Sequence, residues 1–268
     1  MYEIIRKDGT FTRKFNITYD NIDYNLLLKP QAAAQMCQNT AVGHSDKAGY
    51  TVDYFRENQT GWALTGWHLI FKKRPKENES FTITTWTKPF KRLQADRNFM
   101  AKDENGNELF RANSRWFLMD MKKRRPLRLP DGFFSRYIPS PYENAIADED
   151  YKQPNLDLYT LKASRRFKVT RRDIDANNHT NNISYIDWAI DDLTDDLYLN
   201  YNILDLKAEY KKEARKDDTI ESKFYIRNLD EDIIEVSSVF THKDDPDQIL
   251  CRVTTQWEKN NESMKFFL

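Results

Sequence analysis

The sequence predicts an α+β fold that is built twice, and three observations support this prediction. Residues that alternate between apolar and polar recur in short runs, which is typical of β-strands. Each half of the chain contains one helical segment, followed by several of these runs. Short segments of the first half also return in the second half in the same order. The chain is therefore expected to be a tandem duplication of a helix and an antiparallel sheet.

The first half, residues 1–130, opens with an alternating run from Phe11 to Tyr19 that predicts a strand. A helix is expected to begin at Pro30, because proline suits the first helical turn, and to end between Gly43 and Gly49. Four strands are then expected at 62–73, 80–88, 93–103 and 108–119. Asn105-Gly106 predicts a tight hairpin between the last two.

Residues 131–160 are predicted to form a linker, since prolines punctuate the stretch from 126 to 154. The second half, residues 161–268, repeats the order of the first. It is expected to contain a strand at 161–172, a helix at about 182–198, and strands near 203–215, 218–228, 231–242 and 248–257. The DDPD segment at 244–247 is predicted to be a turn.

The two halves can be aligned directly. FNITYDNIDYN at 15–25 matches FKVTRRDIDAN at 167–177 without gaps, with five identical residues in eleven. Two later pairs follow in the same order: FKKRPKENES at 71–80 with YKKEARKDDT at 210–219, and LFRANSRW at 109–116 with LCRVTTQW at 250–257. Three ordered matches beside the same predicted elements favour duplication over chance.

The most distinctive stretch is DIDANNHTNNISYIDW at 173–188. Asp175, Asn177 and His179 are two residues apart, so an extended backbone would project all three to one side. The predicted helix begins directly behind them, and the free backbone N–H groups at a helix start can stabilise an anion. These residues suit acyl chemistry, and the alternative interpretation is a polar turn with an asparagine helix cap.

The motif D-x-N-x-H-x-N-N, followed by Tyr185 and Trp188, resembles the second-half motif of the acyl-ACP thioesterases, the plant FatA/FatB type and their bacterial relatives. The resemblance extends to Trp62, to FTITTW at 81–86 and to SRWFLMDMKKRRPLRLP at 114–130. It implies a double hotdog fold, in which each half wraps an antiparallel sheet around one long central helix.

The resemblance also implies a set of site residues. Asp175, Asn177 and His179 would belong to the active site, together with a glutamate in EYKKEA that corresponds to Glu213. The spacing alone does not separate Glu213 from Glu209, since both would lie on one face of the 203–215 strand. Plant members often carry a cysteine after the glutamate, where this chain has Ala214, so the resemblance excludes a covalent cysteine mechanism here.

The first half retains only part of this motif. Asp23 and Asn25 persist, but Leu27 replaces His179 and Arg74 replaces Glu213. The first half is therefore expected to bind the acyl chain instead of catalysing the reaction. The aromatic residues predicted to line that binding region, any of which can equally be core residues, are Trp62, Trp67, Phe71, Phe81 and Trp86.

The predicted reaction is attack of water on a thioester, with Glu213 as the candidate general base and His179 orienting the water or the thioester. The sequence leaves open how these two residues divide the base and orienting roles. Backbone N–H groups at the start of the second helix would stabilise the oxyanion, at Asn181, Asn182 and Ile183. The predicted partner is an acidic acyl carrier protein. Basic residues flank the site and are expected either to be solvated or to dock this partner: Arg165, Arg166, Arg171, Arg172, Lys211 and Lys212.

Bulk properties exclude several other classes. The formal net charge is zero, which gives no indication of nucleic-acid binding. No glycine follows Gly132, so the second half has no glycine-rich phosphate loop, and no cofactor is expected. Two cysteines and isolated histidines predict neither a disulfide framework nor a metal site. With no signal-peptide pattern and no membrane-spanning run, the expected location is cytoplasmic.

Three alternatives stay open from sequence. The substrate can be acyl-CoA instead of acyl-ACP, or the fold can carry out a hydratase reaction with a similar His and carboxylate. A non-catalytic hotdog that binds acyl thioesters as a regulator would be expected to lack the paired His and Glu and to carry a DNA-binding segment. The protein is expected to be either a monomer with the two halves paired or a homodimer.

Overall fold

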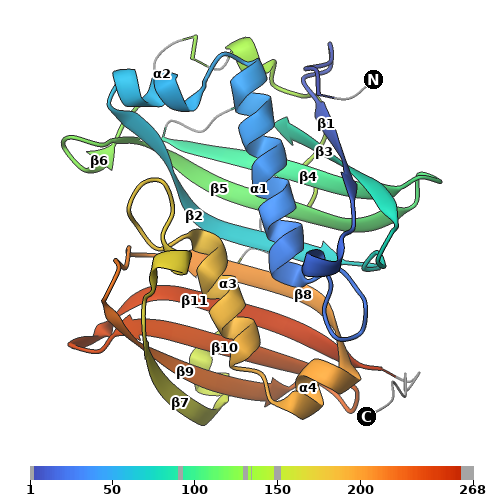
Figure 1. The fold of residues 1–268 in the computed structure, drawn as a ribbon, viewed down its shortest axis with the longest axis vertical. Coiled ribbons are helices and arrows are strands. Elements are labelled where there is room, and N and C mark those ends of the chain that lie inside the picture. The colour runs from blue at the N-terminus through green and yellow to red at the C-terminus, as the bar shows by residue number, and fades with distance from the viewer. Residues whose placement is uncertain (1–2, 90–92, 129–131, 134, 148–151, 261–268) are drawn as a thin grey trace. The chain divides into compact units, whose positions relative to one another are not determined.

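The computed structural model describes residues 3–89, 93–128, 132–133, 135–147 and 152–260 (Figure 1). The chain divides into two compact units, which we call unit 1 (Met1–Tyr151) and unit 2 (Lys152–Leu268). None of the described helices is both long enough and apolar enough to cross a membrane.

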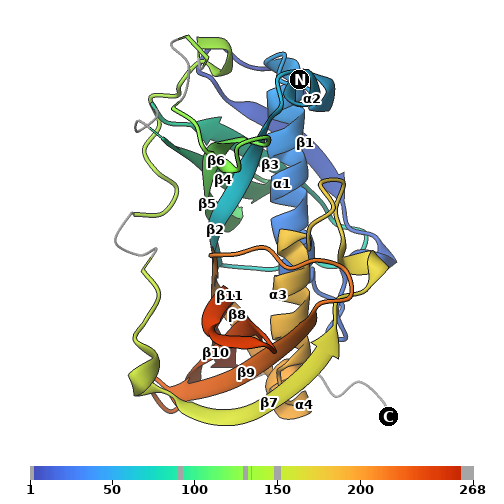
Figure 2. The same ribbon diagram turned by 90° about the vertical axis from the view of Figure 1, so that its left-hand side faces the viewer.

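Unit 1 is an antiparallel sheet with one long helix on its face. The helix is α1 (Pro30–Lys47), followed by the short α2 (Val52–Glu57). The sheet order is β1-β3-β4-β5-β2, and its strands are β1 (Phe11–Asn16), β2 (Thr60–Phe71), β3 (Ser80–Thr87), β4 (Gln94–Asp103) and β5 (Glu108–Asp120). A short strand, β6 (Arg125–Pro126), pairs with the end of β5. Figures 1 and 2 show α1 lying across one face of this sheet.

Unit 2 repeats this arrangement. Its long helix is α3 (Asn182–Asp191), followed by α4 (Asp195–Asn200). The sheet order is β7-β9-β10-β11-β8, and its strands are β7 (Thr160–Lys168), β8 (Tyr201–Tyr210), β9 (Thr219–Asn228), β10 (Ile233–His242) and β11 (Asp245–Lys259). The order matches that of unit 1 strand for strand. The predicted duplication and the α+β class are therefore confirmed.

The duplication extends to individual turns. A 3-10 helix precedes the long helix in each unit, at Tyr19–Asn21 and at Arg171–Asp173. The loop that follows is closed by a bridge between Ile22 and Leu28 in unit 1 and between Ile174 and Thr180 in unit 2. Each loop contains one residue with a left-handed backbone, Leu26 (φ 58°) and Asn178 (φ 63°). A leucine in this conformation is uncommon, which indicates that the loop geometry is imposed by its surroundings.

The helix predicted at 182–198 is wrong in extent, because it is interrupted at residues 192–194. The Asp192 carboxylate accepts hydrogen bonds from Ser222 and Ser238, at 2.5 and 2.8 Å, and Arg165 pairs with it at 2.6 Å. Thr194 then caps α4 by accepting a hydrogen bond from Leu197 N–H. A buried carboxylate that binds the sheet therefore ends α3 before the apolar periodicity does.

Three predicted boundaries in unit 2 are also wrong. The strand predicted at 161–172 ends at Lys168 and gives way to the 3-10 helix. The strand predicted at 203–215 ends at Tyr210, because the N–H groups of Lys211 and Lys212 both donate to Leu250 C=O and the regular ladder stops there. The turn predicted at 244–247 lies at 243–244 instead, and Asp245 already belongs to β11.

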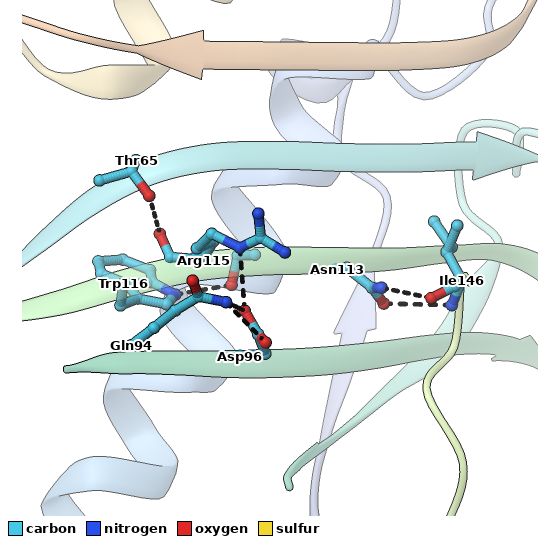
Figure 3. A network of polar contacts seen from close by, with 8 residues as sticks. Thr65, Gln94, Asp96, Asn113, Arg115, Trp116 and Ile146 are labelled. Carbon is cyan, nitrogen blue, oxygen red and sulfur yellow. Dashed lines mark hydrogen bonds and ion pairs between the residues drawn. The ribbon is translucent and has the colours of Figure 1, made fainter. Parts of the chain in front are cut away.

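The division between the two units, at residues 151 and 152, falls within the predicted linker at 131–160. Phe133 and Tyr137 are buried in unit 1. In Figure 3 the Asn113 amide contacts both backbone groups of Ile146, accepting from its N–H at 3.3 Å and donating to its C=O at 2.7 Å. On the unit 2 side, Arg252 donates to Pro154 C=O at 2.6 Å. Ile146 is therefore held by a side chain of the unit 1 sheet, and Pro154 by a side chain of the unit 2 sheet.

Candidate active site

Asp175, Asn177 and His179 lie in a tight turn, so the expectation of an extended backbone is wrong. The N–H of Asp175 donates to His179 C=O at 2.9 Å, and Asn178 N–H donates to Asp175 C=O at 3.1 Å. The Asp175 carboxylate accepts from the N–H groups of Asn177 and His179, at 2.8 and 3.3 Å. Asp175 therefore holds the loop that presents the imidazole, and the Asn177 side chain, which also bonds Asp175, is exposed.

His179 and Glu213 come together in unit 2 although 33 residues of sequence lie between them. His179 Nε2 lies 3.2 Å from Glu213 Oε2. The imidazole side chain is 17% exposed and the carboxylate side chain 47%, so the pair is sheltered at the histidine and open to solvent at the glutamate. This separation allows a proton to pass between the two groups.

Thr180 fixes the two loops that carry this pair. Its backbone N–H and its hydroxyl both donate to Ala214 C=O, at 2.9 and 3.0 Å. Since Thr180 follows His179 and Ala214 follows Glu213, these two hydrogen bonds hold the His179 loop against the Glu213 loop. The sequence analysis missed Thr180. The signal available was the repeat, where Leu28 occupies the Thr180 position and only its backbone N–H can bind, to Pro75 C=O at 2.8 Å.

Glu209 is placed differently from Glu213. It lies within β8 and pairs with Lys211 at 3.5 Å, whereas Glu213 lies beyond the strand end. The expectation that both carboxylates share one face of a long strand is therefore wrong. Among the described contacts of the His179 imidazole, Glu213 supplies the carboxylate.

The helix start offers fewer free donors than the sequence implied. Ile183 N–H already donates to the Asn181 side chain at 3.0 Å, and Asn181 N–H donates to Asp173 C=O at 2.7 Å. Of the three predicted oxyanion donors, this leaves the N–H of Asn182, the first residue of α3. Tyr210 supports this residue, because its hydroxyl donates to Asn182 C=O at 2.8 Å.

The corresponding position in unit 1 is closed by a buried ion pair. Arg74, at the Glu213 position, binds the carboxylate of Asp23, and both side chains are at least 94% buried. Arg74 also donates to Leu28 C=O at 3.3 Å. The Asp23 carboxylate holds its loop as Asp175 does, by accepting from the N–H groups of Asn25 and Leu27. Unit 1 has therefore kept the loop and replaced the His–Glu pair by a structural contact.

Four of the five aromatic residues predicted to bind the acyl chain lie on the helix-facing side of the unit 1 sheet or at its end. Trp67, Phe71 and Phe81 are buried in the core, and Trp62 packs against the cluster around Tyr50. Trp86 lies on the opposite face, where its indole N–H donates to Glu143 C=O at 3.2 Å. The structure thus separates Trp86 from the other four.

The six predicted docking residues are also placed differently from one another. Arg165 pairs with the buried Asp192 and donates to Trp188 C=O at 3.0 Å, so it caps α3. Arg166 pairs with Glu221 at 3.3 Å, and Lys212 bonds Gln248. Lys211 pairs with Glu209. Arg171 and Arg172 are exposed, directly precede the His179 loop, and show no side-chain hydrogen bond or ion pair within the described residues.

Neither cysteine is exposed to solvent. Both Cys37 and Cys251 are fully buried, and burial raises the pKa of each thiol well above its ordinary value. Across the residues that the structure describes, no group of three or more His, Cys, Asp or Glu side chains is arranged to hold a metal ion.

The fold and the paired loops define a tandem hotdog protein that, within the residues the structure describes, carries its His–Glu pair in the second unit. Two family models match this chain: the acyl-ACP thioesterase N-terminal domain over residues 8–137 and the acyl-ACP thioesterase C-terminal domain over residues 159–259. The chain belongs to the acyl-ACP thioesterase family, and the predicted family and double hotdog fold are confirmed.

Similar proteins are found among curated sequences and solved structures. The chain is 26% identical to the chloroplastic acyl-acyl-carrier-protein hydrolase FATB3 of Cuphea viscosissima, covering 81% of this chain and 55% of the relative. It is 24% identical to the chloroplastic oleoyl-acyl carrier protein thioesterase 2 of Arabidopsis thaliana, covering 81% and 64%. The chain thus spans 55% to 64% of the length of these relatives.

A similar fold is seen in the 12:0-ACP thioesterase from Umbellularia californica. The TM-score is 0.84 at 19% sequence identity, and the match covers 95% of this chain and 96% of that one.

Proposed function

We propose that this protein hydrolyses the thioester of a fatty acyl chain on acyl carrier protein, releasing the free fatty acid and the carrier's thiol. The observation that carries the proposal is the His179–Glu213 pair, 3.2 Å apart in unit 2, in a chain of the acyl-ACP thioesterase family. The test is release of free acid and thiol from acyl-ACP by the purified protein.

In the proposed reaction, Glu213 takes a proton from a water molecule whose oxygen forms a bond to the thioester carbonyl carbon. The carbonyl oxygen becomes an oxyanion, which Asn182 N–H is placed to stabilise at the start of α3. The carbon–sulfur bond then breaks, and the proton taken from water passes through His179 to the leaving sulfur. Water and thioester are thereby converted to acid and thiol.

The supporting residues have separate roles. Asp175 keeps the His179 loop closed through its two backbone hydrogen bonds. In this proposal, the exposed Asn177 amide positions the carbonyl or the water. Thr180 holds the two loops together, so we assign it a positioning role.

The carrier protein is proposed to dock beside this loop. Acyl carrier proteins are acidic, and Arg171 and Arg172 are the two predicted basic residues that are exposed and form no side-chain hydrogen bond or ion pair within the described chain. Arg165 and Arg166 are instead held in ion pairs within unit 2.

An acyl-CoA thioesterase is the second candidate, because the His–Glu pair can act on a thioester of either carrier. The exposed Arg171 and Arg172 favour the acidic protein carrier. The non-catalytic regulator is disfavoured because the paired His and Glu are retained and lie 3.2 Å apart.

Both cysteines can be removed without loss of activity if water is the attacking group. We expect the double variant Cys37→Ala and Cys251→Ala to retain turnover within about threefold, because both thiols are fully buried and neither forms part of the His179–Glu213 pair. The measurement is the rate of thiol release, with a melting curve to verify folding. Abolition of activity in a folded double variant would indicate a cysteine nucleophile.

Substitutions in the interior of unit 1 are expected to change which acyl chain is released. One methylene buried in an apolar site contributes about 0.8 kcal/mol, so enlarging or filling the space around Phe71 or Phe81 should shift the preferred chain length. Substitutions at Asp175 or Asn177 should lower the rate for all chain lengths alike. The measurement is relative kcat/KM across a series of acyl-ACPs. Chain-length shifts confined to variants of unit 2 would contradict this division of roles.

A further inference from the structure

The interior of unit 1 contains a row of polar side chains that its apolar surroundings do not satisfy. His44 Nε2, Trp67 Nε1 and Thr87 Oγ1 are buried and have no hydrogen-bond partner within the described part of the chain. His44 and Trp67 are 0% exposed and Thr87 is 1% exposed. Buried polar atoms are normally hydrogen-bonded, so each of these unsatisfied atoms indicates a missing partner.

The strand register places Thr87 and Trp67 in one line with the side chain of Arg97. Arg97 on β4 pairs with Thr87 on β3 and with Ser114 on β5, and Ser114 in turn pairs with Trp67 on β2. Directly paired residues share a face of the sheet. Arg97 Nη1 lies 2.9 Å from His44 Nδ1 on α1, which shows that this is the helix-facing side. We call Thr87, Arg97, Trp67 and His44 the polar row.

The polar row carries an unneutralised positive charge. Arg97 is 91% buried, and its contacts are the His44 ring and the face of Tyr137, 5.4 Å from its guanidinium carbon. No carboxylate of the described residues pairs with it. Burial, together with the charge of Arg97, lowers the pKa of His44 to about 2, so the imidazole is neutral.

The tautomer of His44 follows from this contact. A guanidinium can only donate, so His44 Nδ1 accepts and Nε2 carries the hydrogen. The row thus presents an N–H of His44, an N–H of Trp67 and the guanidinium of Arg97. The polar row therefore has more hydrogen-bond donors than acceptors. A ligand that complements it would supply an anionic oxygen as the acceptor.

Unit 2 shows that the fold does not require this row. The matching line in its sheet joins Ile226, Val236, Thr255 and Leu206. Ile226, Val236 and Leu206 are apolar where Thr87, Arg97 and Trp67 are polar. The fourth position is equivalent in both units, since Ser114 and Thr255 each accept a hydrogen bond from a tryptophan indole at 2.7 Å. The same sheet therefore folds with an apolar row, and the polar row of unit 1 is a specialisation.

An apolar surface continues from the polar row along the sheet. Phe99 follows Arg97 on the same face and contacts Trp67, with ring centroids 5.4 Å apart. Beyond it lie more buried apolar residues of the same face: Leu69, Ile83, Ala101 and Phe110. A polar end followed by an apolar floor matches a ligand with an anionic head and an aliphatic chain.

We propose that the interior of unit 1 contains a carboxylate-binding site for a long-chain aliphatic acid. The carboxylate binds the Arg97 guanidinium, and the chain lies along the floor that begins at Phe99. The carboxylate has two possible sources, a free fatty acid or the distal carboxylate of an acyl chain still attached to its carrier. The second source rests on the hydrolase function proposed above, and the first does not.

The test is calorimetric titration of the full chain with dodecanoate and with methyl dodecanoate, which has the same chain without the charge. We expect the acid to bind at least about tenfold more tightly than the ester, since a buried charged hydrogen bond is lost in the ester. Arg97→Val, which copies Val236, should remove that difference and leave the ester unchanged. Arg111→Val is the matched control, because Arg111 is on β5 but pairs with Glu108 instead of the polar row.

Equal affinity of the unaltered protein for acid and ester would overturn the proposal, and this result needs no variant. Unchanged acid binding in folded Arg97→Val would also overturn it. The source is resolved by comparing hydrolysis of dodecanoyl and ω-carboxy-dodecanoyl thioesters. A loss of at least about tenfold in kcat/KM for the ω-carboxy substrate alone in Arg97→Val supports the distal carboxylate, and dodecanoate inhibition weakened by the same variant supports the free acid. If the protein hydrolyses no thioester, the proposed function fails while the binding measurement still decides this site.

Discussion

Replacing Glu213 by glutamine is expected to lower kcat for acyl-ACP hydrolysis by about 10²-fold or more, the usual scale for losing a positioned general base. Glutamine preserves the size and hydrogen-bonding shape of the side chain but cannot accept a proton from water. His179→Ala should cause a loss of similar scale, because Nε2 is the group 3.2 Å from the carboxylate. The measurement is steady-state release of thiol at saturating acyl-ACP.

Glu209→Gln is the matched control for Glu213→Gln. Glu209 lies four residues earlier in the same segment but within β8, where it pairs with Lys211. Its replacement should change kcat by less than about threefold, as expected for a surface ion pair. A larger loss in Glu209→Gln than in Glu213→Gln would show that the wrong carboxylate has been assigned as the base.

Replacing Arg74 by methionine is expected to lower the free energy of unfolding of unit 1 by about 3–5 kcal/mol. The substitution leaves the carboxylate of Asp23 buried without its ion-pair partner, since that side chain is 6% exposed. The measurement is urea unfolding of the full chain, followed by a probe that reports on unit 1, such as the fluorescence of the buried Trp67.

The double variant Arg74→Met and Asp23→Asn separates charge from packing. Removing both charges should recover part of the lost stability, because the asparagine can remain bonded to Asn25 N–H without a buried charge. A single Arg74→Met variant as stable as the unaltered protein would contradict the assignment of a buried structural ion pair to the Glu213 position of unit 1.

Periodicity and the internal repeat predict most of the fold. The alternation around Phe15 and the proline at Pro30 are local signals, and each half supplies the same ones, so strand order and helix starts follow. The end of α3 does not follow, because it depends on Asp192 binding Ser222 and Ser238 of the sheet. The residue spacing could not predict this tertiary contact.

The sequence indicated which residues belong to the candidate site, but it did not predict their geometry. The two-residue spacing of Asp175, Asn177 and His179 fits both a strand and an Asx-stabilised turn, and the left-handed Asn178 decides for the turn. Glu213 reaches His179 only because β8 stops at Tyr210 and Thr180 binds Ala214.

The polar row could not be predicted from the sequence either. In the sequence, Arg97 resembles any other charged residue of a strand. Its burial against His44 depends on the packing of α1 on the sheet. Comparing the two units shows that this charge is not required by the fold, since the position of Arg97 in unit 1 is occupied by the buried Val236 in unit 2.

The central claim is that unit 2 hydrolyses acyl-ACP through the His179–Glu213 pair. The most direct test is kcat/KM for the purified protein on acyl-ACP and acyl-CoA with identical chains, across a range of chain lengths. We expect acyl-ACP to be preferred, and Arg171→Ala with Arg172→Ala to reduce that preference by raising KM for acyl-ACP alone. Hydrolysis of neither thioester, or of acyl-CoA in preference to acyl-ACP at every chain length, would contradict the account.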